Sequence, residues 1–131
     1  SEIKVDTLTG KTTAKTVTVT VGATATQSLE QGLAKAWVYF DTNDNPPVRD
    51  GSFNVSSLTD NTTEIEVNLT PVMADLFYCP LGTAGQEADN PSNRNISTGI
   101  VSTTKVDTEI YNMQNSQVTA ICYVAVLGGV A

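Results

Sequence analysis

The stretch Lys35-Ala36-Trp37-Val38-Tyr39-Phe40-Asp41 contains the only tryptophan of the chain and three of its eight aromatic residues. Aromatic and β-branched residues of this kind favour a β-strand. In a strand, Ala36, Val38 and Phe40 share one face, whereas Trp37 and Tyr39 share the other. Both faces are apolar. The stretch therefore predicts a strand that is covered on both sides, by the second sheet of a sandwich or by a partner subunit.

Length and composition predict one soluble β-rich domain. The chain has 131 residues, of which 40% are hydrophobic and only 16% are charged, and a typical domain carries about 25% charged residues. It has 14 acidic residues, 7 basic residues and no histidine, so its formal charge is −7. Such a charge opposes nucleic-acid backbones and anionic membranes. We expect no nucleic-acid partner and, since no apolar run approaches about 18 residues, no membrane insertion.

The sequence divides into an extended N-terminal arm at 1–22 and a single β domain at 23–131. Within the arm, 16–21 alternates strictly between Thr and Val, which predicts a strand with one thin apolar face. Such a ribbon cannot form a core alone, so we expect it to lie on the body of the domain or on a neighbouring chain. Residues 22–27 are predicted to be a connector.

One short helix is expected at 28–34, with Thr26 or Ser28 as its candidate N-cap. Turns are predicted at 56–63, and a long polar loop is predicted at 82–97 and expected to face outward. Pro80 should interrupt its strand or place it at a sheet edge. Strands are expected at 35–41, 48–55, 64–69, 76–81, 100–106, 109–113 and 117–127. We therefore predict an all-β fold, an antiparallel β-sandwich or barrel-like sheet of about seven or eight strands.

Catalytic chemistry has few candidates in this sequence. Without histidine, the usual triads and imidazole ligands are impossible. The carboxylate pair Glu64 and Glu66, and the similar pair Asp107 and Glu109, are predicted to lie on solvated strand faces. We expect no enzyme and no catalytic or cofactor-binding residues, and hence no cofactor.

The loop that begins at Asp41 partly matches a calcium-binding loop, with Asp41, Asn43 and Asn45 at alternate positions. However, Pro46 replaces the glycine and Ser52 replaces the bidentate glutamate that such loops need. We expect an Asx-rich turn and no built metal site, with an adventitious cation site as the alternative.

Cys79 and Cys122 both lie in apolar, strand-like contexts. They are expected to be buried thiols that pack as small apolar side chains. A disulfide between paired strands is the alternative that the sequence leaves open.

Four segments of the chain resemble small virion-associated proteins of tailed phages that infect marine bacteria and cyanobacteria. These segments are the N-terminal 1–11, the stretch 28–41 with its Ala-Trp-Val-x-Phe strand, the Ser-Phe-Asn-Val-Ser-Ser-Leu-Thr-Asp-Asn segment 52–61, and the alternating strand 64–75 with its Met-x-Asp turn. The resemblance covers residues 1–81 and is loose from Gly82 onward.

This resemblance implies a non-enzymatic structural protein of the virion, a homotrimer displayed as a tail-fibre tip or knob, or as a capsid decoration. Its partners would be other capsid or tail proteins and, for a fibre tip, a host surface receptor. The N-terminus carries no signal-peptide pattern. We therefore expect synthesis in the host cytoplasm and final location in the virion.

A carbohydrate-binding β-sandwich module is the alternative function. Trp37, Tyr39, Tyr78 and Tyr111 are the candidate stacking residues, although packing in the core is the simpler role for each. A glycan-cleaving enzyme would need two acidic residues that converge in a cleft.

Overall fold

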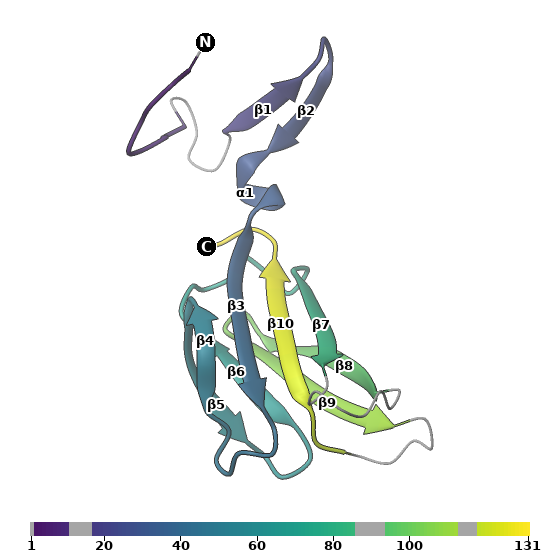
Figure 1. The fold of residues 1–131 in the computed structure, drawn as a ribbon. Coiled ribbons are helices and arrows are strands. Elements are labelled where there is room, and N and C mark those ends of the chain that lie inside the picture. Colours follow the sequence, from purple (N-terminus) through teal and green to yellow (C-terminus); the bar gives the residue numbers. More distant parts are fainter. Residues whose placement is uncertain (1, 11–16, 86–93, 113–117) are drawn as a thin grey trace.

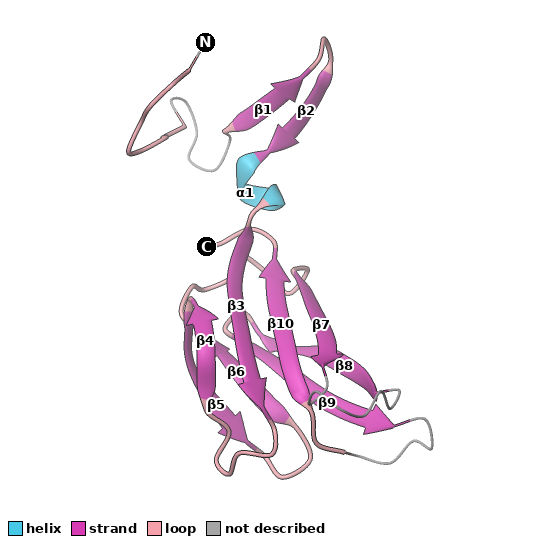
Figure 2. Cartoon of the chain, in the orientation of Figure 1, coloured by secondary structure: helices cyan, strands magenta, loops and turns pink. Residues whose placement is uncertain are grey.

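A computed structural model describes residues 2–10, 17–85, 94–112 and 118–131. Ten strands and one short helix lie in these residues, and every strand pairing between them is antiparallel. Two four-stranded sheets face each other as a sandwich, and a two-stranded hairpin projects beyond one end (Figures 1 and 2). The predicted all-β sandwich class is therefore confirmed, with more strands than expected.

The first sheet has the strand order β4-β3-β10-β7. Its central strands are β3 (Ala34–Asp41) and β10 (Ile121–Leu127), and its edge strands are β4 (Arg49–Phe53) and β7 (Cys79–Gly85). The stretch around Trp37 is thus a central strand, as its aromatic and β-branched residues predict. Pro80 does lie in an edge strand, where a missing N–H is tolerated.

The second sheet has the strand order β5-β6-β9-β8. Its central strands are β6 (Ile65–Leu69) and β9 (Lys105–Asn112), and its edge strands are β5 (Val55–Asp60) and β8 (Arg94–Ser102). The strand predicted at 64–69 is confirmed. Its apolar residues face the first sheet, because side chains alternate between the two faces of a strand.

The core fills the space between the two sheets. Phe40 is its largest fully buried side chain, and Val106 and Cys122 are also completely buried. Met73 joins the core from the segment between β6 and β7, where it forms an isolated bridge to Val130. The other core residues are Ala36, Val38, Val55, Val67, Leu69, Tyr78, Ile110, Ala120, Val124 and Val126.

The two sheets come close together at both sides of the sandwich, at Asn54 on one side and at Gly82 on the other. At Asn54, between β4 and β5, the chain passes from one sheet to the other with a left-handed φ of 56°, which asparagine tolerates better than most residues. On the opposite side, a Cβ at Gly82 of β7 would lie 2.7 Å from Thr98 Cγ2 of β8. Only glycine therefore permits this approach of the two edge strands.

The N-terminal hairpin consists of β1 (Thr18–Val21) and β2 (Ala25–Ser28) and leads into the helical turn α1 (Leu29–Gly32). The predicted short helix is confirmed, and Ser28 is its N-cap. The predicted connector is wrong for residues 25–27, which form a strand. Gly22, with a φ of 72°, permits the tight turn that pairs the Thr/Val ribbon with its own chain.

Other errors of the sequence-based prediction fall on sheet edges. Residues 56–60, predicted as a turn, belong to β5, and residues 82–85 and 94–97, predicted as loop, belong to β7 and β8. Residues 86–93 of that predicted loop lie outside the described residues. A strand predicted across 100–106 is in fact divided by the turn at 103–104 between β8 and β9. Edge strands see solvent along one side, so they tolerate small polar residues that resemble loops.

Candidate functional site

The outer face of the first sheet is unusually apolar for a surface. Strand register places Phe53, Trp37, Ala125 and Leu81 in one row across all four strands, from β4 to β7. Phe53, Trp37 and Leu81 are 49%, 45% and 49% exposed. Isolated exposed apolar residues are common, whereas a contiguous row of them is a candidate interaction surface. We call this outer surface the open face.

A second row of the open face contains Gly51, Tyr39, Tyr123 and Thr83. Tyr39 and Tyr123 are directly opposite each other on β3 and β10, with ring centroids 5.0 Å apart and planes inclined by 54°. This tilted arrangement suits the quadrupoles of two aromatic rings. Tyr123 is 47% exposed, so the pair stabilises the sheet without being part of the core.

A glycine on edge strand β7 makes room for the Tyr123 ring, because a Cβ added to Gly85 would lie 2.6 Å from Tyr123 Cε2. On the other edge, a Cβ added to Gly51 would lie in ordinary van der Waals contact with the Trp37 ring, 3.5 Å from Cζ3. The indole and the phenol thus lie over the backbone of β4 and β7. The result is a broad, low aromatic surface across the sheet.

A shallow hollow of about 530 Å³ lies on the open face. Its lining is almost entirely apolar, and its polar side-chain groups are the Thr83 hydroxyl, the phenol oxygens of Tyr39 and Tyr123 and the indole N–H of Trp37. A sugar needs several hydrogen-bond partners fixed around it, and an apolar partner does not. The residues that line the hollow are Trp37, Val38, Tyr39, Leu81, Gly82, Thr83, Tyr123, Val124 and Ala125.

The expectation that the Trp37 strand is covered on both sides holds within the chain for one side only. Ala36, Val38 and Phe40 are buried against the second sheet, whereas no described residue covers Trp37. Tyr123, Leu81 and Phe53 were not foreseen as members of the open face. The alternation of β10 is the signal for Tyr123, because Cys122 and Val124 on either side of it face the core.

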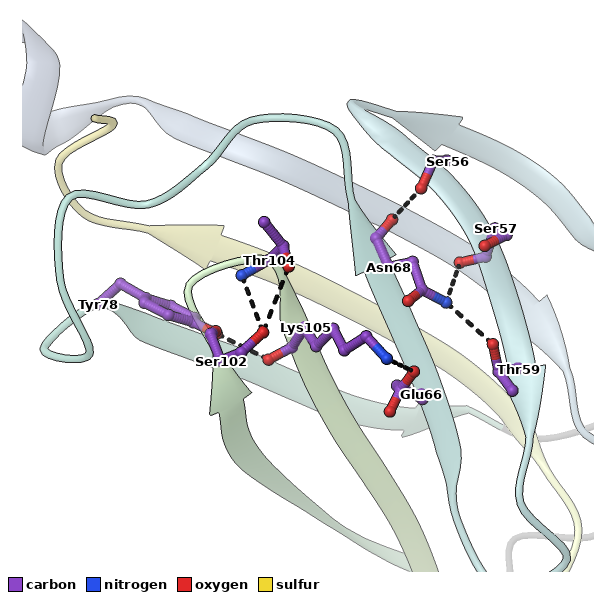
Figure 3. Close-up of polar contacts among 9 residues, drawn as sticks. All are labelled: Ser56, Ser57, Thr59, Glu66, Asn68, Tyr78, Ser102, Thr104 and Lys105. Carbon is purple, nitrogen blue, oxygen red and sulfur yellow. Dashed lines mark hydrogen bonds and ion pairs between the residues drawn. The ribbon is translucent and has the colours of Figure 1, made fainter.

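The outer face of the second sheet has the opposite character. Its central strands present Glu66, Asp107, Glu109 and Lys105 outward. Lys105 Nζ forms an ion pair with Glu66 Oε1 at 2.7 Å (Figure 3). Asn68 Nδ2 donates to Thr59 Oγ1 at 3.0 Å in the same layer. This face is polar and acidic, and is suited to contact with water.

Asp107 is the least satisfied side chain of this acidic face. Its Oδ1 atom is buried and has no hydrogen-bond partner among the described residues. Burial, followed by the nearby carboxylates of Glu66 and Glu109, raises the pKa of the Asp107 carboxyl, and Lys105 partly opposes this rise. Ionisation of Asp107 therefore costs more free energy in the folded state than in the unfolded chain.

The other predicted carboxylates do not form an evident active site. Glu64, Asp60 and Glu109 line a hollow of about 280 Å³ at one end of the sandwich, with several threonines. Glu109 accepts a hydrogen bond from the Tyr111 hydroxyl at 2.6 Å, whereas Glu66 pairs with Lys105. Across the described ranges, no group of three or more Asp, Glu or Cys side chains is placed to hold a metal ion.

The loop after β3 is an Asx turn, as predicted. Asp41 Oδ1 accepts hydrogen bonds from the backbone N–H of Asn43 at 2.8 Å and from its side-chain amide at 3.0 Å. These donors occupy an oxygen that a calcium ion would need. The hydroxyl of Thr42 bonds to both backbone groups of Ala120, which ties this loop to the entry of β10.

The cysteines are only partly as predicted. Cys122 is completely buried, as expected, but Cys79 is exposed, and both thiols are free. Cys79 pairs with Leu127 at one end of β10, whereas Cys122 lies near the other end. Cys79 escapes burial because it shares the outward side of β7 with Leu81.

Two of the predicted stacking tyrosines have other roles. Tyr78 is buried, and its hydroxyl lies 2.6 Å from the carbonyl oxygen of Ser102 and 2.8 Å from that of Lys105 (Figure 3). It thus joins the end of the first sheet to the β8–β9 turn. Tyr111 bonds to Glu109 on the polar side of the second sheet. Of the four candidates, only Trp37 and Tyr39 lie on the open face.

No protein-family model, no curated protein and no solved structure matches this chain. In the part of the chain that the structure describes, the one helix is a four-residue turn, so no helix can cross a membrane.

Proposed function

We propose that this protein is a non-enzymatic structural protein of a phage virion that works as a homotrimer. It would be displayed on the particle as a tail-fibre tip or knob, or as a capsid decoration, in contact with capsid or tail proteins. The resemblance of residues 1–81 supports the phage assignment. The main structural support for the proposed oligomer is the open face, whose row from Phe53 to Leu81 is apolar and is not covered by the described chain.

The contrast between the two sheets supports an assembled and displayed protein. An apolar surface left in water favours association, whereas the acidic outer face of the second sheet favours exposure. A net charge of −7 keeps a displayed surface soluble and repels copies that approach through their acidic faces. One face is thus suited to partners and the other to solvent.

The experiment that tests this proposal has two parts. Light scattering coupled to size-exclusion chromatography of the purified full chain should give the mass of a trimer. Gold-labelled antibodies raised against the chain should then decorate particles of the phage that encodes it, on the capsid or at the tail. A monodisperse monomer at every concentration would contradict the assembly, and unlabelled particles would contradict the virion location.

A carbohydrate-binding module is the second candidate, favoured by the grouping of Trp37, Tyr39 and Tyr123 on one flat face. Aromatic rings on such a face can stack on sugar rings. A glycan array probed with the full chain would test this function. Binding that is lost in Trp37→Ala but kept in Tyr111→Phe would support it, and silence at high protein concentration would remove it.

A further inference from the structure

We infer that the open face of one subunit is covered by the N-terminal segment 2–10 of a neighbouring copy of the same chain. This inference rests on the proposed homo-oligomer and names the surfaces that would form it. Three features of the molecule carry it. They are the absence of charge on the central rows of the open face, the apolar area available, and the position of the segment itself.

The distribution of charge favours association of two copies through the open face. The two central rows, from Phe53 to Leu81 and from Gly51 to Thr83, contain no charged side chain. The opposite surface presents Glu66, Asp107 and Glu109 with Lys105 as a partial counter-charge. Like-charged surfaces repel each other. Two copies of this acidic protein therefore approach at least cost through the open face.

The area of the open face is too small to support a stable interface alone. Phe53, Trp37 and Tyr123 are each about half exposed. Since a buried aromatic side chain covers about 150–250 Å², these three residues and Leu81 offer roughly 350–400 Å². A specific interface buries about 1,000 Å² or more over both partners, of which roughly 57% is apolar. A further apolar contribution of about 200 Å² is therefore required from the neighbouring copy.

The segment 2–10 provides apolar side chains that are largely exposed in the subunit. Ile3, Val5 and Leu8 are 87%, 62% and 63% exposed. An aliphatic side chain buries roughly 60–120 Å² when it is completely covered. Weighted by their exposed fractions, these three side chains together add roughly 200 Å². The open face of one subunit and the segment of the next then bury about 600 Å² of apolar surface in one contact, which is the apolar share of an interface of about 1,000 Å² in total.

The segment is also held away from the open face of its own subunit. Figure 1 shows residues 2–10 beside the hairpin, beyond the end of the sandwich. Leu8, Thr9 and Gly10 border a hollow of about 420 Å³ together with Val17, Leu29 and Leu33 at the base of the hairpin. A segment that extends outward from the body is suited to a neighbour. Ile3 and Val5 lie on one side of an extended chain, and Lys4 and Asp6 on the other.

Two variants of the full chain test the two sides of this contact. Ile3→Asp/Val5→Asp changes side chains that are 87% and 62% exposed, and Leu81→Glu places a charge on the outward side of edge strand β7. Each is expected to raise the dissociation constant of the oligomer at least tenfold in sedimentation velocity over a concentration series. Val101→Glu is the matched control, because Val101 is 46% exposed on β8, in the other sheet, and it should leave the oligomer intact.

Cys79 is a native reporter of the same contact. It is exposed on the outward side of β7, whereas Cys122 is buried, so a maleimide should label one thiol of the folded chain. Labelling should be at least tenfold slower in the wild-type oligomer than in the Ile3→Asp/Val5→Asp monomer. This readout does not depend on whether Leu81→Glu folds.

The outcomes separate this inference from the proposed function. An oligomer that survives both variants, with Cys79 labelled at the rate of a free chain, overturns the inference and leaves the homo-oligomer standing. Disruption by Leu81→Glu alone also overturns it, since the open face would then be covered by something other than the segment. A wild-type monomer at every concentration overturns the inference and the proposed oligomer together.

Discussion

Tyr39 and Tyr123 are direct cross-strand partners on β3 and β10, and their rings lie 5.0 Å apart on the outside of the sandwich. Such a pair contributes about 0.5–1 kcal/mol to the pairing of the two strands. An aromatic pair in the core would also stabilise strand pairing, but it would be buried. Here the pair stabilises the sheet and also contributes aromatic surface to its outer face.

The two phenylalanines Phe40 and Phe53 should differ sharply in their effect on stability. Phe40 is completely buried, and Phe40→Ala should lower the free energy of unfolding by about 3–5 kcal/mol because it leaves a cavity. Phe53 is on the open face, and Phe53→Ala should cost less than about 1 kcal/mol in the dissociated chain. Urea unfolding of both variants measures the difference, and equal losses would mean that the two faces of the first sheet are assigned wrongly.

Two glycines provide a second matched comparison. Gly82→Ala should destabilise the fold by about 1–3 kcal/mol, because its Cβ would lie 2.7 Å from Thr98 Cγ2 and 3.0 Å from Ile96 Cδ1. At Gly99 a Cβ would meet nothing within 4 Å. Gly99→Ala should therefore be neutral or should stabilise by about 0.5 kcal/mol. Thermal and urea unfolding test the pair, and a harmless Gly82→Ala would argue against the close approach of β7 and β8.

The Tyr78 hydroxyl should contribute to stability through the two carbonyl groups that share its proton. Tyr78→Phe leaves the carbonyls of Ser102 and Lys105 without this donor, and should cost about 1–3 kcal/mol. Tyr111→Phe removes a hydroxyl that bonds to Glu109, a side chain on the outer face of its sheet, and should cost less than about 0.5 kcal/mol. Equilibrium unfolding compares them. Similar values for both variants would contradict the role assigned to Tyr78.

Asp107 should make the folded state less stable as pH rises. Its pKa is raised in the folded state, chiefly by burial and then by Glu66 and Glu109, so the folded state binds the proton more tightly than the unfolded state. The resulting stabilisation is complete below the unfolded pKa of about 3.9 and is lost as pH rises through the folded pKa. Asp107→Asn removes this dependence.

We expect Asp107→Asn to be more stable than the wild type at pH 7 by about 0.5 kcal/mol, a usual size for a cross-strand charge pair. The advantage should disappear near pH 3. Urea midpoints measured between pH 3 and 8 provide the test. Asp44→Asn, which makes the same change in charge on an exposed loop, is the control, and a similar pH profile in both variants would exclude a special role for Asp107.

Cys122 should be unreactive in the folded chain. Burial, with a smaller effect of Asp41, raises the pKa of its thiol to about 12, and only the thiolate attacks an alkylating reagent readily. In Cys79→Ser, labelling at pH 8 should therefore follow global unfolding. Mass spectrometry along a urea series tests this, and labelling of the folded variant at the rate of a free thiol would be the contrary result.

The sequence predicted the central strands well because they are buried on at least one side. The apolar residues Ile65, Val67 and Leu69 alternate along β6 because they pack on the core side of the sheet. The aromatic stretch of β3 likewise has one side that packs in the core. The N-cap of α1 at Ser28 and the edge position of Pro80 followed from local backbone chemistry. Each of these features depends on residues that are near one another in the chain.

The edge strands were missed for a physical reason. Ser56 and Ser57 of β5, and the small residues Gly82–Gly85 of β7, bury little. The residues of β7 also pair with β10, which is distant in sequence. The hairpin was missed because Ala25–Ser28 has no apolar pattern and is a strand only through its register with β1. Composition alone cannot distinguish such segments from loops.

The sequence by itself determined the all-β class, the central strands and the two apolar faces of the Trp37 strand, since these follow from side-chain alternation and from β-branched and aromatic content. Only the tertiary structure decided which of those two faces is covered within the chain. Burial of Phe40 and exposure of Trp37 depend on where the second sheet packs, and that position is set by contacts between residues far apart in the chain. The same packing placed Tyr123 and Leu81 beside Trp37 and so created the open face.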